Sequence, residues 1–258
     1  MRIALTIAGS DSGGGAGIQA DLKTFHRFGV FGTSVVTAIT AQNTRGVAAW
    51  TATTPELVTA QLDAVATDLR PAAVKSGMLA SRAVIEAVAD GLRRHALAPY
   101  VLDPVLIATS GDALADTDAA DAIGRRLLPL AALITPNLDE TERLTGATVR
   151  DVGAMGRAAR DLVARGARAA LVKGGHLEGG DVVDVLFDGR ELRVFRRPRI
   201  ITTSTHGTGC ALSAAITAQL ALGEGLSHAV ERSLTWVHAA IASAPGLGTG
   251  HGPLDFLA

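Results

Sequence analysis

Short apolar segments alternate with helical segments along almost the whole chain, and this alternation restricts the fold more than any other feature. The apolar segments are four to seven residues long in most cases, and the segments between them place apolar residues at helical spacing. Strands that alternate with helices of about three turns predict βαβ units and a mostly parallel sheet covered on both faces. We therefore expect an α/β fold, arranged as a three-layer αβα sandwich with a mostly parallel central sheet.

The pattern predicts these elements along the chain. Strands are predicted at 2–8, 31–39, 72–75, 100–102, 131–134, 169–172, 182–187 and 192–195. Helices are predicted at 17–28, 57–69, 82–94, 117–128, 139–144, 155–164, 208–222 and 227–243. Asp188-Gly189 predicts a hairpin that adds antiparallel strands at one edge of the sheet. Since no linker or repeat marks a boundary, we expect residues 1–258 to form a single domain.

Charge and cysteine content exclude several classes of protein. The formal net charge is −1, which argues against a nucleic-acid partner or an anionic membrane surface. The only cysteine, Cys210, allows neither an internal disulfide nor a cysteine-cluster metal site. No apolar run approaches the roughly 20 residues that span a bilayer. We expect a cytoplasmic protein without a membrane segment.

Polar or glycine-rich turns follow nearly every predicted strand. The chain has 29 glycines, and clustered glycines are typical of backbone that approaches another group closely. In a parallel α/β sheet, ligands bind where the strands end. These turns should therefore meet at one rim of the sheet; they lie at 9–17, 40–45, 75–78, 103–104, 135–140, 173–176 and 205–210.

The turn THGTGC, at 205–210, is the most informative of these. Gly207, Thr208 and Gly209 precede a predicted helix and leave its first N–H groups uncovered, which favours a bound anion. The helix dipole would also lower the pKa of the Cys210 thiol. Cys210 could instead be a small buried apolar residue, as free cysteines usually are.

Two carboxylates and a lysine on the same rim predict a metal and phosphate site. Asp103 and Glu140 each follow a strand and a proline-containing turn, and such a pair suits Mg²⁺, which shares its shell with phosphates and water. The alternative is that Glu140 caps its helix and Asp103 bonds its own turn. Lys173, followed by two glycines, is placed to contact a phosphate. Lys75 is interpreted as a strand-end residue.

Seven motifs together resemble one family. The chain resembles the hydroxymethylpyrimidine/phosphomethylpyrimidine kinases of thiamine biosynthesis, in the ribokinase-like superfamily, from Ile3 to Gly252. The motifs are GSDSGGGAGIQADLKTF at 9–25, AQNTRGV at 41–47, KSGML at 75–79, DPVLIATSGD at 103–112, TPNL at 135–138, VKGGH at 172–176 and THGTGCAL at 205–212. The resemblance implies a ribokinase-like fold and transfer of the γ-phosphoryl group of ATP. The acceptors would be 4-amino-5-hydroxymethyl-2-methylpyrimidine and then its monophosphate.

The resemblance also implies roles for individual residues. Gly207, Thr208 and Gly209 would form the anion hole for the transferring group, and Cys210 would occupy the general-base position. Asp103 and Glu140 would orient Mg²⁺. The ATP-binding residues would be Lys173, Asn137 and Thr205. Asp21 and Gln42 would hydrogen-bond the aminopyrimidine ring, and the remaining substrate-binding residues would be Gly9, Met78 and Val105.

Three other functions stay open at the level of sequence. They are a pyridoxal kinase of the same superfamily, a non-catalytic pyrimidine- or thiamine-binding protein, and a Rossmann oxidoreductase, which the missing G-x-G-x-x-G fingerprint disfavours. An exposed sheet edge beside the predicted hairpin favours a homodimer. Segments 108–112 and 175–180 are rich in small residues and are candidates for a loop that closes over the substrate.

Overall fold

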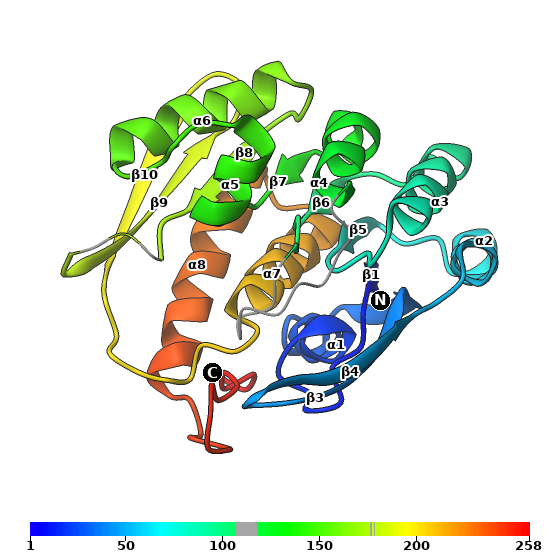
Figure 1. The fold of residues 1–258 in the computed structure, drawn as a ribbon, viewed down its shortest axis with the longest axis horizontal. Helices are drawn as coiled ribbons and strands as arrows, with labels where there is room; N and C mark the ends of the chain where they lie inside the picture. The colour runs from blue at the N-terminus through cyan, green and yellow to red at the C-terminus, as the bar shows by residue number, and fades with distance from the viewer. Residues whose placement is uncertain (107–117, 176, 178) are drawn as a thin grey trace.

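A large central sheet organises the chain (Figure 1). The computed structural model describes residues 1–106, 118–175, 177 and 179–258. Within these residues, eight strands form one sheet in the order β10-β9-β8-β7-β6-β5-β1-β2. The strands are β1 (Ile3–Ala8), β2 (Phe31–Val36), β5 (Ala73–Ser76), β6 (Tyr100–Leu102), β7 (Leu133–Ile134), β8 (Ala170–Lys173), β9 (Asp181–Phe187) and β10 (Leu192–Pro198).

The sheet is mostly parallel, as the alternation of elements predicts. β1 pairs in parallel with both β2 and β5, and the parallel pairing continues through β6 and β7 to β8. β9 and β10 are antiparallel and form the hairpin predicted at Asp188-Gly189. Because the parallel strands share one direction, the turns that follow β1, β5, β6, β7 and β8 meet at the same rim of the sheet.

Helices cover both faces of the sheet, which confirms the three-layer αβα architecture. One face packs against α2, α3, α4 and α6, and the other against α1, α7 and α8. α4 continues through a π-helical turn and a 3₁₀ turn, Ile123–Leu127 and Leu128–Leu130. The helices are α1 (Gly17–Arg27), α2 (Pro55–Asp68), α3 (Arg82–Arg94), α4 (Ala119–Ala122), α5 (Leu138–Thr145), α6 (Val152–Ala164), α7 (Thr208–Leu222) and α8 (Leu226–Ala242).

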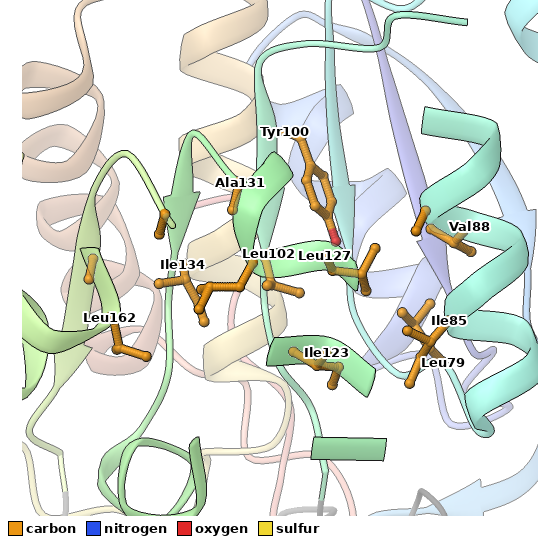
Figure 2. Close-up of a cluster of buried hydrophobic side chains, with 14 of the residues drawn as sticks. Leu79, Ile85, Val88, Tyr100, Leu102, Ile123, Leu127, Ala131, Ile134 and Leu162 are labelled. Carbon is orange, nitrogen blue, oxygen red and sulfur yellow. The ribbon is translucent and has the colours of Figure 1, made fainter. Parts of the chain in front are cut away.

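Alternation along the strands divides the core between the two faces. In β6, Leu102 packs toward α3 and α6, whereas its neighbour Val101 packs toward α7 and α8. Figure 2 shows the first of these clusters, in which Leu102, Ile134 and Leu127 lie between the sheet and its helices. Full burial of each such side chain stabilises the fold by about 1.5–3 kcal/mol. The strands whose ends form the rim are therefore fixed by packed side chains on both faces of the sheet.

Helix α7 is buried on nearly all sides, which matters for the site at its N-terminus. Small residues such as Ala211, Ala214 and Ala218 let it approach the sheet closely, and each is fully buried. Helices that are apolar all round belong in a protein interior. The first turn of α7 is therefore held by both the sheet and the flanking helices α1 and α8.

The prediction of one strand at 31–39 is wrong, because the chain turns at Thr37. The backbone N–H of Thr37 donates to the carbonyl of Ala8 (3.0 Å), and its hydroxyl donates to the carbonyl of Met78 (2.6 Å). After this turn, β3 (Ala38–Asn43) pairs with β4 (Gly46–Ala52) in a separate antiparallel hairpin. Residues 40–45, predicted as a turn at the end of a strand, lie in this hairpin instead. β4 was not predicted.

No helix in the ranges that the structure describes is both long and apolar enough to cross a membrane.

Candidate active site

A cavity of about 660 Å³ opens at the carboxyl ends of the parallel strands. Its lining comes from the turns after β1, β5, β6, β7 and β8, from the β3–β4 hairpin and from the first turn of α7. All but one of the residues proposed from the sequence line this cavity. They are Gly9, Gln42, Met78, Asp103, Val105, Asn137, Glu140, Lys173, Thr205, Gly207, Thr208, Gly209 and Cys210.

The glycine loop, residues 9–17, is organised around the buried carboxylate of Asp11. The backbone N–H groups of Gly13, Gly15 and Ala16 donate to this carboxylate at 2.8, 3.0 and 2.8 Å. Nε2 of His206 lies 2.8 Å from Asp11 Oδ2. Burial raises the pKa of Asp11, but the bonds from His206 and the backbone outweigh it, so the net pKa is lowered. Sequence reasoning missed both Asp11 and His206.

The anion loop, residues 205–209, leads into α7 and packs directly on the glycine loop. Gly207 is the N-cap of α7 and has a left-handed backbone, with φ of +77°. A Cβ there would overlap the carbonyl oxygen of Gly15, closer than real Cβ contacts allow. Because Gly207 has no side chain, no N-cap group competes for the amides of Gly209 and Cys210. The Thr208 hydroxyl donates to the Thr205 carbonyl at 2.8 Å. This geometry fits the predicted anion hole.

Cys210 lies in the first turn of α7 as a half-buried free thiol. The prediction that the helix dipole lowers its pKa is wrong. Burial raises the pKa to about 11, and the nearby carboxylates of Asp21 and Asp103 act in the same direction. The Lys75 ammonium and the Gly17 N–H lower it by less than burial raises it. The thiol is therefore protonated at neutral pH.

Asp103 and Lys173 form a buried ion pair below the cavity. Lys173 Nζ lies 3.1 Å from Asp103 Oδ1, and their side chains are 15% and 1% exposed. The hydroxyls of Thr135 and Ser213 donate to the same carboxylate at 3.2 and 3.1 Å. Burial raises the pKa of Asp103, but Lys173 and Lys75 outweigh it, so the pKa is lowered. Asp103 is therefore ionised at neutral pH.

Glu140 both caps its helix and faces the cavity. Its side chain accepts from the Asn137 N–H at 2.7 Å, and its N–H donates to the Asn137 side chain at 2.9 Å, forming a capping box. Burial raises the pKa of Glu140 to about 7, although Lys173 attracts the charged form. Among the described residues, no three or more His, Cys, Asp and Glu side chains group as a metal site. Within the described residues, Asp103 and Glu140 therefore form a pair of carboxylates near Lys173, and no third His, Cys, Asp or Glu side chain joins them.

Asp21 is the one proposed residue that does not line the cavity. Its side chain is fully buried, and its carboxylate accepts from the Thr6 hydroxyl (2.6 Å) and from Lys75 Nζ (2.8 Å). In this packing the Asp21 carboxylate is bonded to Thr6 and Lys75 and does not line the cavity. Lys75, interpreted from sequence as a strand-end residue, lies near the end of β5 and is completely buried in this pair. Burial lowers its pKa, but Asp21 and Cys210 outweigh that effect and raise it.

The far side of the cavity has an apolar wall that the sequence did not reveal. Leu212, Leu234 and Val237 come from α7 and α8 and line it. Arg197 of β10 also lines this side and is paired with the buried Asp184. The sequence does not single out Arg197 as a cavity residue, because β10 carries several arginines and nothing in the pattern distinguishes one from another.

The structure describes part of only one of the two segments predicted to close over the substrate. Segment 108–112 lies outside the described residues. Part of segment 175–180 is described, and there the Arg199 guanidinium donates to the carbonyls of Gly175, Leu177 and Gly179 at 2.8, 2.6 and 3.1 Å. These bonds hold that segment against the end of β10.

Comparisons with known proteins agree with this geometry. The family model for phosphomethylpyrimidine kinase matches residues 11–255. A hydroxymethylpyrimidine/phosphomethylpyrimidine kinase of Rhizobium meliloti is 54% identical over 98% of this chain and 96% of its own length. The crystal structure of a phosphomethylpyrimidine kinase from Clostridium difficile 630 is 41% identical, with a TM-score of 0.84, covering 93% of this chain and 100% of that one. An ADP complex of Bacillus subtilis pyridoxal kinase is 37% identical, with a TM-score of 0.92, covering 99% of this chain and 97% of that one. The chain therefore belongs to the phosphomethylpyrimidine kinase family.

Proposed function

We propose that this protein transfers the γ-phosphoryl group of ATP to the hydroxyl of 4-amino-5-hydroxymethyl-2-methylpyrimidine, and then phosphorylates the monophosphate to the diphosphate. The main structural support is the position of the anion loop, which lies between the glycine loop and the Asp103–Lys173 pair. All three face one cavity. Phosphoryl transfer needs in-line positioning and neutralisation of negative charge, with little covalent work by the protein. Membership of the family supports the same reaction.

The part of the cavity beside the β3–β4 hairpin suits a small heteroaromatic ring. Met78 and Val105 pack with Ala38 in one small apolar cluster and present an apolar wall to the cavity. A Cβ at Gly9 would lie 3.0 Å from the Met78 sulfur, so glycine keeps this wall open. The Gln42 side chain faces the cavity and its carbonyl accepts from the Thr40 hydroxyl at 3.3 Å, which leaves its amide group to donate to a ring nitrogen.

The chemistry proposed for the first transfer uses the anion hole and Cys210. The amides at the start of α7 stabilise charge on the transferring group, and the Lys173 ammonium adds a positive charge beside them. Cys210 is proposed to accept the proton of the acceptor hydroxyl. Since its pKa is about 11, only the small thiolate fraction present at neutral pH can take this proton, and it becomes the thiol as the phosphoryl group is transferred. The second acceptor is an ionised phosphate and needs no such base.

ATP and Mg²⁺ are proposed to occupy the side of the cavity toward β8 and α8. Asp103 and Glu140 both interact with the single ammonium of Lys173, so full ionisation of both carboxylates leaves one negative charge uncompensated. A hard divalent cation fits that donor set, and it would neutralise phosphate charge when bound. Asn137 and Thr205 are proposed to contact the nucleotide, and the apolar wall at Leu212 suits a base.

Pyridoxal phosphorylation is a second candidate activity. It is favoured by the likeness to the Bacillus subtilis pyridoxal kinase, at a TM-score of 0.92. Pyridoxal carries a hydroxymethyl group on a flat six-membered nitrogen ring, so the same apolar wall could hold it. The non-catalytic alternative is disfavoured because Asp103, Lys173 and Cys210 all face the cavity.

We further propose that residues 1–258 act as one domain and that the protein is a homodimer in the cytoplasm. The cavity lining runs from Ala8 to Ile241, so the site needs nearly the whole chain. The two strands of the β3–β4 hairpin carry no charged side chain and expose Ile39 and Ala41, and isolated two-stranded sheets are marginally stable. This hairpin, or the exposed edge strand β10, would form the contact, and light scattering would give the mass.

The test is an ADP-release assay on the purified protein with three acceptors: the pyrimidine alcohol, its monophosphate and pyridoxal. We expect turnover with both pyrimidines, dependent on Mg²⁺. The Lys173→Gln variant, which loses the positive charge at the anion hole, serves as the inactive control. Binding of the pyrimidine without ADP release by the wild-type protein would support the non-catalytic alternative and refute the proposal. Faster turnover of pyridoxal than of either pyrimidine would make pyridoxal the primary acceptor.

A further inference from the structure

The buried pair of Asp11 and His206 joins two loops of the cavity that lie far apart in the sequence. Asp11 Oδ2 and His206 Nε2 are 2.8 Å apart, and the two side chains are 1% and 8% exposed. The residues are 195 positions apart in the chain. Neither is used by the phosphoryl transfer described above. A buried charge is retained in a fold only when it is paired and hydrogen-bonded, so this pair calls for an explanation.

Each partner is fixed within its own segment. Asp11 organises the glycine loop through the N–H groups of Gly13, Gly15 and Ala16. The N–H of His206 donates to the Gly252 carbonyl at 3.0 Å, and a parallel bridge joins His206 to Pro253. The imidazole therefore connects the glycine loop to the anion loop and to the C-terminal segment.

The two loops also touch through their backbones, so the pair determines how they fit together. A Cβ at Gly15 would lie 2.6 Å from His206 Cδ2, and a Cβ at Gly207 would overlap the Gly15 carbonyl. Glycines at both positions allow this close approach. Since Gly207 is the N-cap of α7, a shift of His206 moves the amides of the anion hole relative to the glycine loop.

We infer that Asp11 and His206 are a positioning pair for phosphoryl transfer: their hydrogen bond sets the anion hole in line with the acceptor. The inference rests on the proposed function. Asp11 already accepts four hydrogen bonds and has little capacity left for a ligand. The pair acts through the amides at Gly207–Cys210. Displacement of reacting groups by about 1 Å lowers the rate by about 100-fold, so a weakened pair affects kcat before it affects binding.

The experiment compares His206→Phe with His206→Gln. Phenylalanine keeps a flat ring and removes the hydrogen bond, whereas the glutamine amide can replace Nε2 as a donor to Asp11. The matched control is His95→Phe, because His95 Nε2 makes a similar bond to Asp63 Oδ1 (2.6 Å) away from the cavity. For each variant, kcat, KM for both substrates, the folded fraction, and the ratio of ADP to phosphorylated pyrimidine are measured.

We expect His206→Phe to lower kcat by about 10- to 100-fold, with KM for ATP within about threefold of wild type. Its ratio of ADP to product should rise, because water competes when the acceptor is out of line. His206→Gln should recover most of kcat, and His95→Phe should leave kcat and the ratio unchanged. If His206→Phe does not fold, Asp11→Asn replaces it and should show the same loss of kcat and the same rise in the ratio.

Equal loss of kcat in His206→Phe and His206→Gln would overturn the inference. An unchanged ratio of ADP to product in His206→Phe would also overturn it. Where His206→Phe does not fold, the same test applies to Asp11→Asn. A kcat per folded molecule equal to that of the His95 control would show that the pair contributes only to stability. Failure of the proposed function is visible separately, because the wild-type protein would then not phosphorylate the pyrimidine at all.

Discussion

Replacement of Gly207 by alanine tests whether the contact between the glycine loop and the anion loop positions the anion hole. Gly207 has a left-handed backbone, with φ of +77°, and a Cβ there would overlap the Gly15 carbonyl oxygen. The structure offers a matched control in Gly146, the C-cap of α5, with φ of +75° and no atom within 4 Å of its Cβ position. The two substitutions introduce the same backbone strain, but only one introduces the overlap.

The expected magnitudes follow from this difference. A left-handed backbone costs a residue with a Cβ about 1–2 kcal/mol, so Gly146→Ala should lower the free energy of unfolding by that amount. Gly207→Ala should lose more, because the loops must also separate by roughly 1 Å. A displacement of that size at the reacting centre lowers kcat by about 100-fold. The Gly146 variant should keep the kcat of the wild-type protein.

The assay is ADP release with the pyrimidine alcohol, combined with urea unfolding of each variant. If Gly207→Ala kept more than about half of the wild-type kcat, the backbone contact would not position the anion hole. The same conclusion would follow if both alanine variants lost kcat equally, since strain alone would then explain the loss.

The other predictions concern Cys210, Glu140, the buried lysine and Gln42. Cys210→Ala should lower kcat of the first transfer by about 10²–10⁴-fold and that of the second transfer much less, because only the first acceptor needs a base; equal losses in assays of each step would contradict the base role. Burial raises the pKa of Glu140 to about 7, so its contribution to stability is greatest below its unfolded pKa near 4.3 and is lost as the pH rises through 7. Urea unfolding should therefore show that Glu140→Gln flattens this part of the pH profile, and an unaltered profile would contradict the assigned pKa. Lys75→Met should destabilise the fold by about 3–5 kcal/mol by leaving Asp21 unpaired, and adding Asp21→Asn should recover part of the loss; full stability of the single variant in urea would contradict the pairing. Gln42→Ala should raise KM for the pyrimidine and leave KM for ATP unchanged, and an unchanged pyrimidine KM would remove Gln42 from the binding site.

The sequence predicted the architecture well where apolar patterns are local. The parallel strands, the hairpin at Asp188-Gly189 and the buried helix after Gly207 all follow from nearest-neighbour signals. The strand at 31–39 failed because Thr37 looks like any β-branched strand residue. Its hydroxyl and N–H bond to Met78 and Ala8, and such partners cannot be deduced from spacing.

The site was predictable to the extent that its residues follow strands. Asp103 and Lys173 were expected on one rim and form an ion pair there. Asp11 and His206 were not found, because no pattern relates residues so distant in the chain. The pKa of Cys210 was predicted with the wrong sign, since the helix dipole is visible in the sequence and the burial that outweighs it is not. Glu140 shows that two interpretations can be compatible, because one oxygen caps α5 while the side chain faces the cavity.

The His206 junction has a consequence for how the protein is made. The glycine loop is synthesised well before its partners on the other side of the cavity, since 195 positions separate Asp11 from His206 and Pro253 follows later still. A chain that is still emerging from the ribosome can form β1 and much of the sheet without being able to hold a transferring phosphoryl group. Closing this contact over such a sequence separation also carries a loop-closure entropy cost, so we expect the site to form late in folding.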